Sequence, residues 1–303
     1  MLLILKNKKK TGPKMKKFLR LTGAELARKG VDFSVSSLEE TEIQIEKNKI
    51  GLSICGKPVT AWSTIYIRKV GRNRGVAHML AHVSKESGVN LIDRYHEQNK
   101  DASDAAKIIQ MFRLASAGIS IPKTYFAGSY PKKHLRNAIA YLKLPIVIKE
   151  CNSSQGAGVF LAKNISELEK IILERSSQDD RKEIFLQEFI PNDFEYRILV
   201  TGSKVAVTEK KIRSEKEAFR NNVHLGATEE FVDISTVGSH LKKEAVLAAR
   251  TTHIQVAGVD IIERPDGSPV IFEVNSCPTL TLDTKISPEI KKLAEYLTGC
   301  EKK

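Results

Sequence analysis

The segment from 258 to 275 carries the residues best suited to chemistry, two carboxylates and an amide in predicted strands. Two strand-like runs flank Asp266-Gly267, a dipeptide typical of tight hairpin turns. A hairpin that is symmetric about this turn places Asp260 directly opposite Glu273. Because side chains alternate along a strand, Asn275 then shares the face of Glu273. Three oxygen-bearing side chains are therefore expected close together.

The opposite face of this hairpin is expected to be apolar. The same register pairs Val259 with Val274, and it pairs Ile261 with Phe272. Like charges directly across a hairpin repel each other, so a cation should lie between the two carboxylates. Hard divalent cations prefer such oxygen ligands. The alternative is a solvated acidic strand pair neutralised by Arg264, and a shift of the turn register would separate the residues.

A glycine-containing loop at 153–158 lies between two predicted strands. Glycines let the backbone approach an oxyanion, so the loop is a candidate phosphate clamp, although plain hairpin turns have the same composition. It lacks the Gly-Lys-Ser/Thr of a P-loop, and a strand follows it rather than the helix of a dinucleotide fingerprint. Lys149 ends the preceding strand and could hold phosphate as a point charge or extend to solvent at a sheet edge.

A basic and amide-rich segment follows further along the chain. It contains Lys210, Lys211, Arg213, Arg220, Asn221 and Asn222. Such groups suit a phosphoryl group in transfer, where negative charge accumulates. A solvated strand and loop has the same composition.

The composition is that of a soluble globular protein, with 303 residues, 41% hydrophobic and 28% charged. No apolar run approaches the ~18 residues of a membrane span. The four cysteines form no Cys-x-x-Cys pair, so neither a zinc site nor a disulfide framework is indicated. We therefore expect a cytoplasmic protein with no membrane contact.

Positive charge is concentrated at the start of the chain. Residues 1–30 contain ten Lys or Arg against Glu25 as the one acid, a net charge of +9 out of +13 for the whole chain. The run of lysines at 6–17 is typical of a solvated loop or arm. It could also dock on RNA or on an acidic partner.

Taken in order, these residues resemble the ATP-grasp superfamily, and most closely its RimK-type amino-acid (alpha-L-glutamate) ligases. The resemblance covers about residues 105–283. It rests on the segments Leu-Pro-Ile-Val-Ile-Lys at 144–149, Ser-Gln-Gly-Ala-Gly-Val at 154–159, Leu-Gln-Glu-Phe-Ile at 186–190, Glu-Tyr-Arg at 195–197, Phe-Arg-Asn-Asn at 219–222, Ala-Gly-Val-Asp at 257–260 and Phe-Glu-Val-Asn at 272–275.

The resemblance implies an α/β (α+β) ATP-grasp fold in three parts. These are a small α/β pre-ATP-grasp domain at 1–119, a lid at 120–190, and a subdomain at 191–303 whose antiparallel sheet carries the metal site. Apolar periodicity predicts helices at 15–29, 74–87, 101–118, 166–175, 240–254 and 288–298. It predicts strands at 2–5, 31–36, 43–45, 65–67, 145–149, 159–161 and 184–190.

The resemblance also implies roles for the matched residues. Lys107 and Lys149 are expected to bind the nucleotide phosphates, under a closing loop that includes Ser154, Gln155, Gly156 and Gly158. The adenine and ribose pocket is expected to be lined by Gln187, Glu188, Phe189, Ile190 and Glu195. Asp260, Glu273 and Asn275 are expected to bind two Mg²⁺ or Mn²⁺ ions. The γ-phosphate and the acyl-phosphate are expected to be contacted by Lys211, Arg213, Arg220 and Asn222.

The implied activity is ATP-dependent ligation of a carboxylate and an amine through an acyl-phosphate. The resemblance favours addition of an amino acid such as glutamate to a protein, ribosomal or small-molecule acceptor. The alternatives are a glutathione-synthetase-like dipeptide ligase and a catalytically silent nucleotide-binding module that docks on RNA or an acidic partner. The sequence does not decide whether the chain forms a homo-oligomer.

Three positions depart from the family pattern. Glu195 stands where the family usually has Asp, and Ala218 replaces an acid. Cys277-Pro278-Thr279 replaces a small residue followed by Pro-Gly, directly after the predicted metal strand. The third change borders the expected substrate site, so it leaves the identity of the substrate open.

Overall fold

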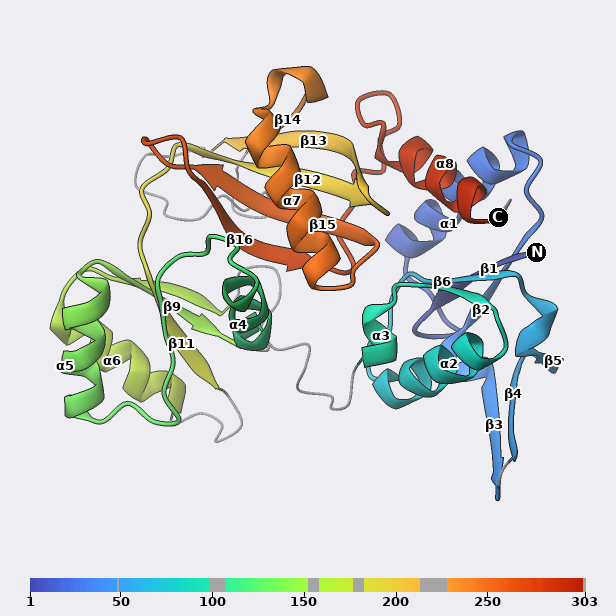
Figure 1. Cartoon of the computed structure of the whole chain (residues 1–303), viewed down its shortest axis with the longest axis horizontal. Helices are drawn as coiled ribbons and strands as arrows, with labels where there is room; N and C mark the ends of the chain where they lie inside the picture. Colours follow the sequence, from blue (N-terminus) through green and yellow to red (C-terminus); the bar gives the residue numbers. More distant parts are fainter. Residues whose placement is uncertain (48, 99–106, 152–157, 177–182, 213–227, 302–303) are drawn as a thin grey trace.

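A computed structural model describes residues 1–47, 49–98, 107–151, 158–176, 183–212 and 228–301 (Figure 1). Within these residues the strands form four sheets. The mixed α/β architecture with antiparallel sheets confirms the predicted fold class. No described helix has the length and apolar character needed to cross a membrane.

The N-terminal part is built on a parallel sheet whose strand β1 is buried on both faces. Leu2 and Ile4 pack with α1, whereas Leu3 and Leu5 pack with α2. A continuous apolar run is what a doubly covered parallel strand requires. The sheet order is β2 (Phe33–Ser37), β1 (Leu2–Lys6), β6 (Thr64–Ile67) and β7 (Asn90–Ile92), with helices α1 (Pro13–Arg28) and α2 (Arg74–Glu86). The short helix α3 (Tyr95–Gln98) follows β7.

A small antiparallel sheet extends from this part, with its hairpin directed away from the rest of the molecule (Figure 1). It contains β3 (Thr41–Glu46), β4 (Lys49–Ile54) and β5 (Lys57–Pro58).

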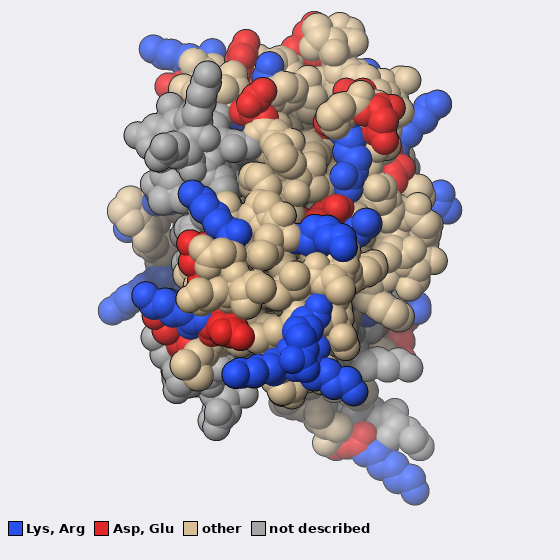
Figure 2. Space-filling model, turned by 90° about the vertical axis from the view of Figure 1, so that its left-hand side faces the viewer, with Lys and Arg blue, Asp and Glu red and all other residues tan. Residues whose placement is uncertain are grey.

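The segment 120–190, which we expect to form the lid and call the lid below, contains an antiparallel sheet covered on one face by two helices. Leu135 and Ala138 of one helix and Leu168 and Ile172 of the other share a core with the sheet. The sheet order is β10 (Val159–Ala162), β9 (Ile146–Glu150), β11 (Ile184–Glu188) and β8 (Thr124–Tyr125), with helices α5 (Lys132–Leu142) and α6 (Ile165–Ser176). Figure 2 looks at this side of the molecule and shows Lys and Arg side chains spread over it, with fewer Asp and Glu.

The central sheet is antiparallel throughout and carries the acidic hairpin. Its order is β14 (Thr228–Val232), β13 (Lys204–Ile212), β12 (Phe194–Thr201), β15 (Val256–Glu263) and β16 (Pro269–Asn275). Helix α7 (Ser239–Thr251) covers one face, and α4 (Lys107–Ser116) packs beside it and β16. The last helix, α8 (Glu289–Glu301), packs against α1 (Figure 1).

The predicted hairpin register holds near its carboxylates and fails nearer the turn. Asp260 pairs with Glu273 and Val259 with Val274. A β-bulge then shifts the pairing, so Ile261 lies opposite Ile271 rather than Phe272. The extra residue, Phe272, packs instead with the apolar cluster around Ile190.

The lysine run at 6–17 is not a free arm, contrary to the simplest interpretation of its composition. Lys6 ends β1, is only 9% exposed, and donates from Nζ to the carbonyl oxygens of Lys8 (2.9 Å) and Lys9 (2.8 Å). Helix α1 already begins at Pro13. The remaining lysines therefore lie on a short, tied loop and on a helix surface.

Candidate active site

A row of charged side chains crosses the central sheet on the face opposite α7. Glu273, Asp260, Arg197 and Glu209 are direct neighbours on β16, β15, β12 and β13. Directly paired residues point to the same side of a sheet. The residues next to them along each strand, such as Ile198 and Val259, pack into the core beneath α7. Alternation along each strand therefore places apolar core residues on one face and the charged residues on the other.

Asp260 is held by two cations. Arg197 donates from Nε and Nη2 to the two carboxylate oxygens, each at 2.8 Å. Lys211 Nζ lies 3.3 Å from Oδ1 of Asp260 and 3.5 Å from Oε1 of Glu195. Burial acts to raise the pKa of Asp260, but the charges of Arg197 and Lys211 outweigh it and lower this pKa to about 2. Asp260 is therefore ionised at neutral pH.

Two lysines from other elements reach the same place. Lys107, at the start of α4, places Nζ 4.0 Å from Oε1 of Glu273. Lys149, on β9 of the lid, lies 5.7 Å from the ring centre of Phe272. Burial lowers the pKa of Lys149 to about 8, with Glu273 acting to raise this pKa and Lys107 to lower it further. Both lysines therefore lie near Glu273, and their convergence on nucleotide phosphates stays a prediction.

The donor set fits a hard divalent cation. Asp260 and Glu273 face each other, and Asn275 Nδ2 lies 3.4 Å from Oδ2 of Asp260. No group of three His, Cys, Asp or Glu gathers as metal ligands among the described residues, and the third oxygen donor that these residues offer here is the Asn275 amide. Two carboxylates and an amide oxygen are ligands suited to Mg²⁺, with water and phosphate completing the shell.

Strand β11 of the lid offers a buried acceptor near its end. Gln187 is 1% exposed, donates from Nε2 to Oγ1 of Thr124 at 2.9 Å, and leaves its Oε1 without a hydrogen-bond partner. The Glu188 carboxylate instead binds Arg264, at 2.6 Å, and accepts from the backbone N–H of Lys123 at 3.0 Å. The alternative interpretation had Arg264 neutralise the Asp260–Glu273 pair, but Arg264 binds Glu188. Arg197 and Lys211 pair with Asp260, and Lys107 lies near Glu273.

The family model described as RimK-like ATP-grasp domain matches residues 102–297, more than half of the chain. The chain belongs to the RimK-like ATP-grasp family.

Curated relatives of this RimK-like chain carry a common description. A protein of Cellvibrio japonicus (strain Ueda107), named probable alpha-L-glutamate ligase, is 33% identical over 58% of this chain and 56% of its own length. Probable alpha-L-glutamate ligase 1 of Pseudoalteromonas atlantica (strain T6c / ATCC BAA-1087) is 29% identical over 86% of this chain and 83% of its own. The chain spans only about half the length of the first curated relatives it matches.

Solved structures share the fold. The ATP-grasp ligase PsnB, complexed with a phosphomimetic variant of its minimal precursor, Mg and ADP, superposes with a TM-score of 0.71. The superposition covers 99% of this chain and 98% of PsnB, at 13% sequence identity. The fold shared with PsnB thus includes the described N-terminal residues 1–47 and 49–98, where we expected a small α/β pre-ATP-grasp domain.

Some predicted site residues of the RimK-like chain fall outside the described residues. These are Ser154, Gln155, Gly156, Arg213, Arg220 and Asn222. Gly158 is described, and its carbonyl accepts from the N–H of Glu150 at 2.8 Å, which continues the ladder between β9 and β10.

Sequence reasoning assigned no role to three residues that the structure places at this RimK-like site. Arg197 lies two residues after Glu195, so strand alternation could have placed it beside Asp260. Gln110 of α4 binds the backbone of Val274 twice, donating to its carbonyl at 2.7 Å and accepting from its N–H at 2.9 Å. Glu209 ends the charged row. No local signal in the sequence indicates the Gln110 contact.

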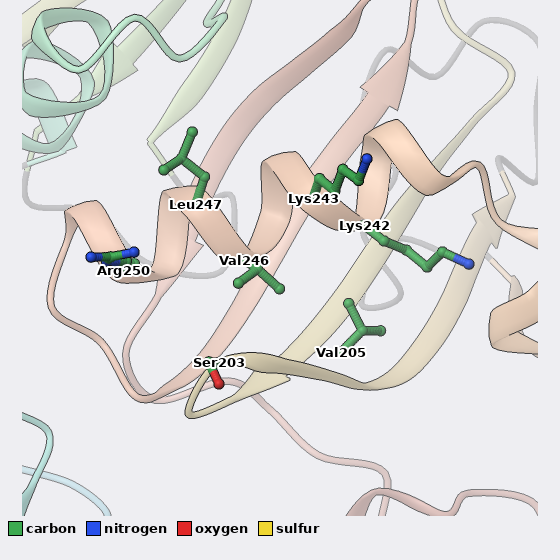
Figure 3. A pocket seen from close by; sticks show the side chains of 7 residues that line it. All are labelled: Ser203, Val205, Lys242, Lys243, Val246, Leu247 and Arg250. Atoms are coloured by element: carbon green, nitrogen blue, oxygen red, sulfur yellow. The ribbon is translucent and has the colours of Figure 1, made fainter.

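A separate hollow lies on the other face of the sheet, between α7 and the turn from β12 to β13 (Figure 3). Lys242, Lys243 and Arg250 stand around it, with Val205 and Val246 also lining it. Because the central sheet separates this hollow from the charged row, we place no part of the chemistry there.

Proposed function

We propose that this chain is an ATP-dependent ligase that joins a carboxylate to an amine through an acyl-phosphate. The observation that carries the proposal is the convergence of Asp260, Glu273 and Asn275 with Lys107 and Lys149. Oxygen ligands for a divalent cation and ammonium groups for phosphates are what phosphoryl transfer requires. Membership of the RimK-like family supports the same conclusion.

In the proposed reaction, the acid substrate's carboxylate attacks the γ-phosphorus of ATP, and ADP leaves with the electron pair of the broken bond. The amine then attacks the acyl carbon, a C–N bond forms, and phosphate leaves. Two Mg²⁺ or Mn²⁺ ions, when bound, neutralise and polarise phosphate oxygens. Asp260, Glu273 and Asn275 would hold the ions, and Lys107 and Lys149 the phosphates.

The remaining residues position these groups. Arg197 and Lys211 keep Asp260 ionised and fixed in place, since both hydrogen-bond to it. The nucleotide base and ribose are assigned to residues 187–190 and Glu195. The unpartnered Oε1 of Gln187 supplies one acceptor for the base. None of these steps needs a nucleophile from the protein.

The amine substrate is proposed to be an amino acid, with glutamate as the first candidate. The names of the curated relatives support glutamate. The precursor bound by PsnB makes a peptide or protein an eligible acid substrate. A dipeptide ligase of the glutathione-synthetase type is the second candidate, because Cys277-Pro278-Thr279 alters the border of the substrate site.

An acidic or ribosomal acceptor would dock on the exposed lysines of 6–17. Lys8, Lys10, Lys14 and Lys17 are all exposed and lie outside every matched motif. Their charges act at a distance and have no assigned part in the chemistry.

The decisive experiment is ADP release from the purified chain with Mg²⁺, pooled amino acids and pooled peptides, with mass spectrometry of the product. We expect a product equal to acid plus amine minus water. Glu273→Gln should abolish it, whereas Glu230→Gln, an exposed acid on β14, should not. ATP binding without turnover in any pool would favour the silent module, and full activity of Glu273→Gln would refute the metal assignment.

A further inference from the structure

Glu209 is a buried carboxylate on the active face that none of these steps uses. It lies on β13, directly across from Arg197, and is 3% exposed. Its Oε1 has no hydrogen-bond partner. Among the described residues it forms no ion pair, because Arg197 directs Nε and Nη2 to Asp260 and Lys211 lies between Asp260 and Glu195.

Two further carboxylates act on Glu209 from neighbouring elements. Glu229 of β14 is exposed and lies across from Lys211. Glu289, at the start of α8, is 2% exposed and accepts from the backbone N–H of Thr281 at 2.7 Å. Burial raises the pKa of Glu209 to about 8; Lys211 and Arg197 act to lower this pKa, and Glu229 and Glu289 to raise it. Glu209 is thus protonated at neutral pH, and no described cation pairs with it.

A buried, unpartnered carboxylate is costly, and the cost disappears when a donor binds it. A divalent cation is a poor candidate, since no three metal-ligating side chains gather here among the described residues. The tight burial of Glu209 favours a small donor such as a primary ammonium. Glu209 stands two strands from Asp260, which is about 10 Å at the usual strand spacing. A group bound there would lie beside the phosphates rather than on the metal ligands.

We propose that Glu209 binds the ammonium group of the amino-acid substrate, the amine partner in the proposed ligase reaction. The inference rests on the proposed ligase function, whose amine site it locates. Binding releases to solvent the proton that Glu209 carries at neutral pH.

The test is binding, measured by calorimetry with Mg²⁺ and a non-hydrolysable ATP analogue present. The probes are the twenty amino acids, each compared with its N-acetyl derivative, which lacks the ammonium. At least one amino acid should bind the wild type and its N-acetyl form should not. Glu209→Gln should weaken that binding about ten- to a hundredfold, the loss of a hydrogen bond to a charged group. Glu230→Gln should leave it unchanged.

The wild type alone provides a second measurement, which does not depend on how well Glu209→Gln folds. Affinity should rise from pH 6 to pH 8, and titration in buffers of different ionisation enthalpy should show proton release on binding. Equal binding to Glu209→Gln, equal binding of N-acetyl derivatives, or no proton release would overturn the inference.

The two proposals fail separately. Turnover of ATP with amines other than amino acids would overturn the Glu209 inference and leave the ligase function intact. Amino-acid binding that depends on Glu209, without turnover of any substrate pool, would refute the ligase function alone.

Discussion

The two faces of the central sheet are made by the same strands and have opposite characters. Beneath α7, Leu241, Ala245 and Ala248 pack on Ile198 and Val259 without exposed side-chain surface. On the other face the neighbours of those strand residues are Arg197 and Asp260, part of a charged row. The face beneath α7 is therefore apolar along these strands, while the other face carries the charged row beside a smaller apolar area where Leu199 and Val207 pack with α8. Substitutions on the two faces should have different consequences.

The largest expected effect is on the charged face. Asp260→Asn removes a metal ligand and the partner of Arg197, so both activity and stability should fall. Breaking a buried ion pair typically costs about 3–5 kcal/mol. Urea unfolding and ADP release would measure the two losses. Glu263→Gln, an exposed acid on the same strand, is the control, and unchanged activity in Asp260→Asn would contradict the assignment.

The apolar face should respond in stability alone. Leu241→Ala removes a 1% exposed side chain from the core and should cost about 2–5 kcal/mol of unfolding free energy. Leu247→Ala changes the same residue type on the same helix at a 43% exposed position and should cost about 0.5 kcal/mol or less. Activity per folded molecule should survive in both variants, and its loss in Leu241→Ala would show that the faces are coupled.

Glu209→Gln should raise the free energy of unfolding at alkaline pH, whereas Leu241→Ala should lower it. The folded pKa of about 8 lies above the ordinary 4.5. The unfolded chain therefore loses this proton first, and wild-type stability falls as pH rises from about 4.5 to 8. The variant lacks that loss, so its advantage should grow over this window to a few kcal/mol. A difference in unfolding free energy that is constant from pH 5 to pH 8 would contradict the shift.

The lysines that reach the charged face should affect nucleotide binding. Lys149→Met or Lys107→Met should each weaken ATP binding by about 1.5–3 kcal/mol, the strength of a hydrogen bond to a charged group. In the wild type, ATP affinity should also fall as pH rises through about 8, where free Lys149 loses its charge. Lys163→Met, an exposed lysine of the lid, is the control. Unchanged affinity in both variants would argue against a phosphate site here.

The smallest effect is expected at the exposed lysines of 6–17, which belong to neither face of the central sheet. Changing Lys8, Lys10, Lys14 and Lys17 to Gln should weaken association with an acidic macromolecular acceptor, mainly at low salt, because exposed charges act within a Debye length of about 8 Å. Lys6 is left in place, since its ammonium holds the loop. Turnover of small substrates should not change. Wild-type affinity and salt dependence in this variant would mean that these lysines only aid solubility.

The spacing of apolar residues predicted the long helices and strands, because an element with one buried face repeats its apolar residues at the period of that element. The predicted helix at 74–87 is α2 (Arg74–Glu86), and the predicted strand at 145–149 is β9 (Ile146–Glu150). The helix α5 was missed although Leu135, Ala138 and Leu142 stand at helical spacing. The strands β5 and β8, two residues each, have too few residues to show any period.

The site was predictable where one strand pair sets the geometry. The pairing of Asp260 with Glu273 follows from the turn at Asp266-Gly267 and from alternation. The bulge at Phe272 does not, because it depends on packing against Ile190 from the end of the lid. The roles of Lys107 and Lys149 came from the family resemblance. The charges around Glu209 come from β12, β13, β14 and α8, and local sequence patterns do not connect these elements.

The clasp between Gln110 and Val274 has a consequence for assembly. β16 is the last strand of its sheet, and such an edge presents free N–H and C=O groups on which another chain could add a strand. Gln110 occupies both groups of Val274, and the carbonyl of Ser120 accepts from the N–H of Ile271 at 2.9 Å. The helix side chain and the loop thus close the border of the sheet at the strand that carries Glu273 and Asn275. A second molecule cannot extend the sheet there without first displacing α4, so the strand with the metal ligands is protected from strand-by-strand aggregation.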